Sequence, residues 1–351
     1  NPTYQFLTWE FFHPDALAVA PLLFAYWAAR SARWRWFVVA TVLAMACKED
    51  VALVVAGLGL LIWLRGDRGH GLRTALAGFG WFLLSTRLLM RRALGGLDPF
   101  YDAFFPELGG DALGVVRGAL ARPRRVFDIA TRPDRISYYR MILAPFAFLP
   151  LAEPPTMALV AGPLLAVNAL TSSPYARDYR YHYSALVVAG VTVATVEVIA
   201  RLGRNPSARR FLVGLVAATA LATSVAWGPS PIGVKYRSGI WPLVDDPRVA
   251  AKRHAVDLVP PNARVAAGYD LVPHLAHRVE IYQFPEPWTV FTWGIAGEGL
   301  PDPDRVEWLV LDRRHFLTED DRSLAERLLS GSFQVRFERD GVVVAQRTRP
   351  G

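Results

Sequence analysis

Three clusters of polar side chains have residue types that can bind a charged group. The first is Lys48-Glu49-Asp50, which separates two apolar runs. A lysine can hold a phosphate while a neighbouring carboxylate positions a hydroxyl, although the charges can also simply neutralise one another. Charges at membrane depth are costly and usually face a protein cavity, so this cluster is a candidate site.

The second cluster lies near the N-terminus, where Glu10 and His13 precede an apolar run that Pro14 and Asp15 open. Pro14 and Asp15 favour the start of a helix, and the Asp15 carboxylate can cap it. Glu10 and His13 have no comparable structural role. They are candidates for binding, with a position at the membrane interface as the alternative.

The third cluster, residues 172–183, contains two arginines, a histidine and four tyrosines. Its candidate binding residues are Tyr175, Arg177, Arg180 and His182. The planar guanidinium of arginine binds two phosphate oxygens at once, so the cluster can recognise an anionic headgroup. The alternative is an aromatic belt whose arginines reach the membrane interface.

Metal and cofactor motifs are absent from the sequence. His274 and His277 have the spacing of a ligand pair, but no third or fourth ligand is evident. No phosphate-binding glycine loop follows any expected strand. The lone Cys47 lies in an apolar run and is typical of packing. We therefore predict no cofactor, and a divalent metal has no support.

The composition indicates a membrane protein with a soluble part. Hydrophobic residues make up 52% of the 351 residues. The net charge of +8 comes almost entirely from arginines, many of which flank apolar runs, because lysine occurs only at positions 48, 235 and 252. We interpret this charge as setting membrane topology and expect no nucleic-acid partner.

Eight apolar runs predict about eight helices that enter the membrane. They are residues 15–29, 34–47, 51–64, 72–90, 137–151, 156–170, 184–200 and 211–228. Several are short: 14 helical residues reach about 21 Å, less than the ~30 Å hydrocarbon core. We expect such helices to stop beside a wet cavity. One long helix over 34–64 is the alternative, but it would place basic loops on opposite sides of the membrane.

The arginines predict which helix ends share a side. Three of the four compact connections are strongly basic, and basic connections stay on the cytoplasmic side. The four connections are residues 30–35, 65–73, 151–155 and 201–210. The extracytoplasmic side then receives residues 1–14, 48–50, 91–136, 171–183 and everything after 229.

The expected fold is mainly α: a polytopic helical bundle over 1–228, followed by a small extracytoplasmic α/β domain over 229–351. A long loop at 91–136 carries a helical pattern at 112–121. In the second domain we predict helices at 246–259, 271–277 and 319–329. Strands are predicted at 264–269, 279–284, 306–311, 333–337 and 342–346, the last two joined at Asp340-Gly341.

The order and spacing of these motifs resemble a bacterial membrane-protein family, domain of unknown function 2079. The matching segments are 10–15, 48–50, 148–154, 162–170, 181–185 and 273–278. That family is similar in architecture to the GT-C superfamily of integral-membrane glycosyltransferases, which typically take sugar from a polyprenyl-phosphate donor outside the cytoplasm. The resemblance implies a multi-pass protein of the bacterial cytoplasmic membrane whose C-terminal domain is extracytoplasmic.

The resemblance also implies partners and roles. The expected partners are the bilayer, a polyprenyl-phosphate sugar donor and a saccharide, lipid or protein acceptor. Lys48, with Arg177 or Arg180, would stabilise the departing phosphate, while Glu10, His13, Glu49 and Asp50 would line the pocket. No residue of this chain receives the catalytic role, because the family's acidic loop is expected upstream of Asn1. A transporter of lipid or solute and a non-catalytic scaffold are the alternatives.

Overall fold

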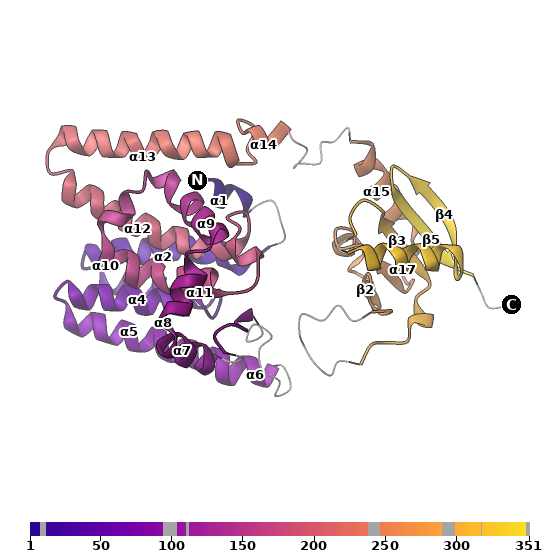
Figure 1. The fold of residues 1–351 in the computed structure, drawn as a ribbon, viewed down its shortest axis with the longest axis horizontal. Helices are drawn as coiled ribbons and strands as arrows, with labels where there is room; N and C mark the ends of the chain where they lie inside the picture. Colours follow the sequence, from indigo (N-terminus) through magenta and orange to yellow (C-terminus); the bar gives the residue numbers. More distant parts are fainter. Residues whose placement is uncertain are drawn as a thin grey trace. The chain divides into compact units, whose positions relative to one another are not determined.

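The computed structural model describes residues 1–7, 12–93, 104–109, 112–237, 246–289, 299–316 and 318–348. The chain forms two compact units, Asn1–Trp241 and Pro242–Gly351, which are described separately below. Figure 1 shows a helical first unit and a second unit built on a small sheet. The boundary that composition predicts, at 228/229, lies at the end of helix α13 and stays a prediction.

The first unit is a bundle of helices whose positions follow the apolar runs. They are α1 (Pro2–Phe6), α2 (Pro14–Arg30), α3 (Trp34–Met45), α4 (Val51–Leu64), α5 (Arg68–Leu83), α6 (Met90–Ala93), α7 (Ala112–Ala121), α8 (Pro123–Ala130), α9 (Pro133–Leu143), α10 (Pro154–Thr156), α11 (Gly162–Leu170), α12 (Ala185–Leu202), α13 (Pro206–Trp227) and α14 (Val234–Arg237). Two π-helical segments, η1 (Leu84–Leu89) and η5 (Met157–Ala161), join α5 to α6 and α10 to α11. A helix forms at 112–121, where the sequence predicts one.

The prediction of about eight spans was wrong in number. Within the described ranges, two helices are long and apolar enough to cross a membrane, His182–Leu202 and Pro206–Trp227. The other apolar runs do form helices, but α3 has 12 residues and α4 has 14. At 1.5 Å per residue these helices are about 18 and 21 Å long, too short for the ~30 Å hydrocarbon core.

The turn at residues 46–50 divides the segment 34–64 into α3 and α4, which confirms two helices rather than one. Asp50 occupies the N-cap position of α4, yet its carboxylate accepts no hydrogen bond from the first turn. Its carboxylate faces Lys48 instead.

Close packing in the bundle depends on small residues. A Cβ atom on Gly57 of α4 would lie 1.7 Å from the carbonyl oxygen of Leu159 in η5, so only glycine allows this approach. Helix α12 is mostly buried, whereas α13 runs along the edge of the bundle and is mostly exposed (Figure 1). Large apolar side chains are exposed on several helices, among them Trp36 and Leu43 on α3, Leu76 and Phe79 on α5, and Phe211 and Leu221 on α13.

The second unit is an α/β domain, as predicted. Its strands are β1 (Val265–Ala267), β2 (Ile281–Gln283), β3 (Trp308–Asp312), β4 (Phe333–Arg339) and β5 (Val342–Arg347), in the order β2-β1-β3-β5-β4. Strand β1 is parallel to both β2 and β3, whereas β5 is antiparallel to β3 and β4. The β4–β5 turn is Asp340-Gly341, and both residues have positive φ, as the predicted hairpin requires.

Helices cover both faces of this sheet. Helices α15 (Pro247–Leu258) and α16 (Val272–Leu275) pack on one face, and α17 (Glu319–Ser330) packs on the other. The chain therefore leaves the parallel strands β1 and β3 toward opposite faces. In open α/β sheets this divergence opens a crevice at the carboxyl ends of the strands.

Candidate functional site

Residues from all three predicted clusters meet at one end of the helical bundle. The Lys48 Nζ atom lies 3.1 Å from Asp15 Oδ1 and 3.3 Å from Asp50 Oδ2. The same ammonium group lies 5.7 Å from the centre of the Tyr183 ring. We call His13, Asp15, Lys48, Asp50 and His182 the polar centre.

Three helices position the polar centre, because α2, α4 and α12 all begin there. His13 is the N-cap residue of α2 and Asp15 lies in its first turn. Lys48 lies in the turn before α4, and His182 opens the short 3₁₀ segment η7 (His182–Ser184) that leads into α12. The positive ends of three helix dipoles therefore point toward the carboxylates and stabilise their charge.

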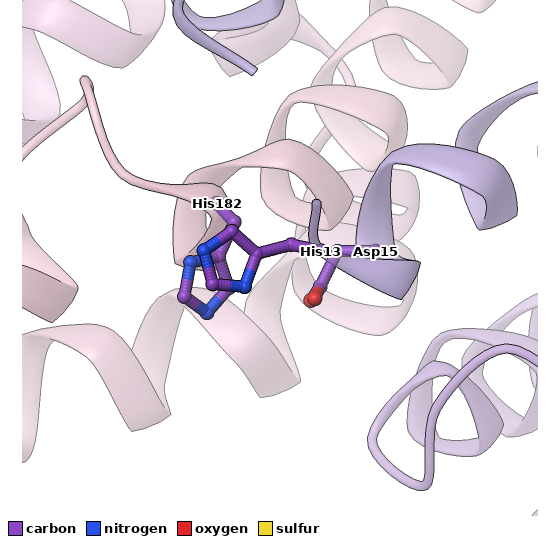
Figure 2. A group of neighbouring side chains, drawn as sticks. All are labelled: His13, Asp15 and His182. Atoms are coloured by element: carbon purple, nitrogen blue, oxygen red, sulfur yellow. The ribbon is translucent and has the colours of Figure 1, made fainter. Parts of the chain in front are cut away.

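The two histidines stack against each other beside the Asp15 carboxylate (Figure 2). Their ring centres are 3.5 Å apart and the planes differ by 17°. Asp15 is only 1% exposed. Among the described residues, neither Asp15 Oδ2 nor His182 Nδ1 has a hydrogen-bond partner, although both atoms are buried. The centre thus holds polar atoms whose bonding capacity is unused.

The charges of the centre influence one another. Burial would lower the pKa of Lys48, but the carboxylates of Asp50 and Asp15 raise it, so the lysine is charged at neutral pH. Burial raises the pKa of Asp50 to about 6, although Lys48 opposes this effect. Glu49, which lies between Lys48 and Asp50 in the sequence, adds a further negative charge that raises the pKa of both groups.

Three residues of the third predicted cluster lie in other networks. The Arg177 side chain donates to Asp134 Oδ2 at 2.9 Å and to the carbonyl oxygens of Thr171 and Ser173. Arg180 pairs with Asp178, with Nε 2.9 Å from Oδ2. The Tyr175 ring packs edge-on against Tyr181. These contacts favour a structural role for both arginines, and Glu10 lies outside the described residues.

Two networks escaped the sequence reasoning. Asn168 donates to the Tyr138 hydroxyl and to the carbonyl oxygen of Tyr183, both at 3.0 Å, and so fixes the backbone beside His182. At the opposite end of the bundle, Glu197 accepts a hydrogen bond from the Tyr26 hydroxyl at 2.5 Å and pairs with Arg65. An acidic residue inside the apolar run 184–200 was the signal that could have identified Glu197.

Ion pairs around Glu197 join the four compact connections that the sequence places on one side. Arg30 lies 3.8 Å from Glu197, and Arg65 bridges Glu197 to Glu153 at 3.1 Å. Arg201 lies 3.7 Å from Glu153. These connections therefore meet at one end of the bundle, opposite the polar centre. Which end faces the cytoplasm stays a prediction.

A second charged cluster lies in the α/β unit, in a pocket at the carboxyl ends of β1 and β3. The Asp312 side chain is fully buried there, and its Oδ2 lies 2.8 Å from Lys252 Nζ and 2.9 Å from Arg248 Nη2. Asp270 also pairs with Lys252. Burial would raise the pKa of Asp312, but hydrogen bonds from Lys252, the Arg314 backbone N–H and Arg248 lower it to about 2.

Acid is expected to weaken the α/β unit through Asp312. Because its pKa is lower in the folded protein, its contribution is complete above about pH 4 and is lost as pH falls toward 2. We expect this contribution to the free energy of unfolding to be about 1–2 kcal/mol, since the charges of Lys252 and Arg248 are partly screened by solvent. Pepsin cleavage of the full chain within 246–348 should rise steeply between pH 4 and 2. The Asp312→Asn protein should already be sensitive to pepsin at pH 4. If its cleavage depended on pH in the same way as that of the wild type, the prediction would be contradicted.

The first unit is a helical bundle with exposed apolar faces, two helices able to cross a bilayer and a buried charged centre. These features define a membrane protein, which also has a C-terminal α/β unit. A family model described as "Predicted membrane protein (DUF2079)" matches residues 2–344, so the chain belongs to this family. Comparison with curated proteins and with solved structures gives no match.

Proposed function

We propose that this chain is part of a membrane glycosyltransferase that takes sugar from a polyprenyl-phosphate donor. The observation that carries the proposal is the convergence of Asp15, Lys48 and His182 from distant segments into one buried centre. A centre of this kind at the end of a membrane bundle can receive a polar headgroup while its lipid chain stays in the bilayer. The exposed apolar faces of α3, α5 and α13 suit contact with bilayer lipid.

The transfer breaks the bond between the sugar C1 atom and the phosphate oxygen, and forms a bond from C1 to the acceptor oxygen. Polyprenyl phosphate leaves, and the acceptor proton passes to a base. The Lys48 ammonium has three N–H bonds, of which Asp15 and Asp50 take two. The third can donate to a phosphate oxygen as negative charge develops there. The Asp50 carboxylate, whose Oδ1 atom has no hydrogen-bond partner among the described residues, can position the acceptor hydroxyl.

Donor cleavage by the full-length protein in lipid nanodiscs tests the proposal. The probes are polyprenyl-phosphate glucose and polyprenyl-phosphate mannose, each labelled in the sugar, and release of polyprenyl phosphate is measured. We expect His13→Gln to lower the rate at least tenfold, because the His13 ring stacks on His182 beside Asp15 and so positions the centre. His70→Gln is the matched control, since His70 lies at the opposite end of the unit and pairs with Asp67.

Three outcomes would contradict the proposal. Wild-type protein could leave both donors intact, or His13→Gln could retain the full rate with an unchanged melting temperature. Labelled donor that crosses the bilayer without cleavage would favour a transporter instead.

A further inference from the structure

The polar centre contains three ligand groups of the kind that bind transition metals. His13, Asp15 and His182 each offer a ligand atom, and these atoms lie within 4.8 Å of one another. Figure 2 shows the two imidazole rings stacked with the Asp15 carboxylate beside them. Two imidazoles with one carboxylate form a donor set that Zn²⁺, Fe²⁺ and Mn²⁺ accept, with positions left open for water or substrate.

Unused bonding capacity points to a ligand at this place. Asp15 Oδ2 and His182 Nδ1 are buried and without hydrogen-bond partners among the described residues. An unpaired buried carboxylate oxygen is costly, and a bound cation would remove that cost. Lys48 holds only the other oxygen, Oδ1, and so fixes the orientation of the carboxylate.

The charge around the three ligands also favours a cation. One lysine, Lys48, faces three acidic residues, Asp15, Glu49 and Asp50. With the carboxylates ionised, the formal charge of this group is negative by two. A divalent ion bound to neutral histidines would balance that charge.

We propose that His13, Asp15 and His182 bind one divalent transition-metal ion, with Lys48 as the outer partner that orients Asp15. Tetrahedral ligand atoms about 2.1 Å from a metal are roughly 3.4 Å apart, and the three ligand atoms lie within 4.8 Å of one another. Because an imidazole binds a metal in its ring plane, the two stacked rings need to turn before both can bind the same ion. The inference rests on the proposed function for the role of the ion, which would sit where the donor phosphate is expected to bind.

The α/β unit contains a second ligand group, Asp270, Asp312 and His315, and it carries a weaker argument. The Lys252 ammonium already occupies the space between the two carboxylates, because it pairs with both. Both Asp312 oxygens have donors. Among the described residues, this cluster therefore lacks the buried atoms without hydrogen-bond partners that the polar centre contains.

Metal binding is measured on the full chain in detergent, without an oligohistidine tag and after treatment with a chelator. Zn²⁺ is titrated by calorimetry and counted by mass spectrometry, and Co²⁺ reports ligand geometry by its visible absorption. We expect one tight Zn²⁺ per chain. Affinity should fall at least tenfold in His13→Ala and in His182→Ala, as loss of one of three ligands predicts. His70→Ala and His315→Ala are matched controls and should bind like wild type.

The result separates the metal from the proposed reaction, because no sugar donor is present. Saturating Zn²⁺ should also raise the melting temperature of wild-type protein but not of His13→Ala. Zn²⁺ binding that is unchanged in both His13→Ala and His182→Ala would overturn the inference. So would loss of binding in His315→Ala alone. Donor cleavage that persists in metal-free protein would remove the ion from the reaction while leaving the transferase proposal intact.

Discussion

Lys48→Ala should destabilise the helical unit by about 3–5 kcal/mol, because it removes one partner of a buried ion pair. Asp15 is 1% exposed, and Lys48 Nζ at 3.1 Å is the charge that compensates it. In metal-free protein without the ammonium group, the Asp15 carboxylate stays buried with no cation, or takes up a proton. Chemical denaturation of the full chain in detergent, followed by tryptophan fluorescence, measures the change in the free energy of unfolding.

A double substitution distinguishes the lost pair from a general packing defect. Lys48→Met with Asp15→Asn keeps the volumes of both side chains and removes both charges. We expect it to be more stable than Lys48→Ala by at least about 2 kcal/mol, since replacing a buried pair by neutral groups is often close to neutral. Equal stability of the two proteins would contradict a buried ion pair as the cause.

This prediction changes how activity data at Lys48 are interpreted. An inactive Lys48→Ala protein can reflect the loss of the phosphate contact or the loss of the folded centre. Lys48→Arg retains the positive charge next to Asp15 but presents a planar, larger group. A stable and inactive Lys48→Arg protein would therefore support a specific role of the ammonium group in transfer.

Glu197→Ala should lower the free energy of unfolding of the helical unit by about 3 kcal/mol, the second-largest effect that we expect. Glu197 is 7% exposed and accepts from Tyr26 and Arg65 at the end of the bundle opposite the polar centre. Its removal leaves the Arg65 guanidinium with Glu153 and Thr156 as its remaining partners and the Tyr26 hydroxyl without its acceptor. The same denaturation experiment measures the loss.

Two variants serve as controls for Glu197→Ala. Glu197→Gln keeps an acceptor for Tyr26 and should lose less than Glu197→Ala. Glu338→Ala removes a carboxylate that forms an exposed pair with Arg313 in the α/β unit, and we expect a change within about 0.5 kcal/mol. If Glu197→Ala were no more destabilising than Glu338→Ala, the Glu197 network would not contribute to the stability of the bundle.

The sequence by itself determined the secondary structure closely in the α/β unit and around the charged turn, but it did not predict helix α8 inside the long loop at 91–136. Strands and helices of the α/β unit lie within a few residues of their predicted positions, and the hairpin turns at Asp340-Gly341 as expected. Helix α3 ends just before the charged turn at 46–50, and α4 begins just after it. These features depend on local periodicity and on the backbone preferences of single residues, and a short segment of sequence determines both.

Only the tertiary structure decided which polar residues meet. His13 and His182 are far apart in the chain, and nothing in their local sequence distinguishes a stacked pair from two separate interfacial histidines. Arg177 shares a cluster with His182 in sequence, yet its guanidinium pairs with Asp134. The physical reason is that apolar periodicity fixes where a helix forms, whereas the pairing of charges depends on how helix ends are brought together by packing.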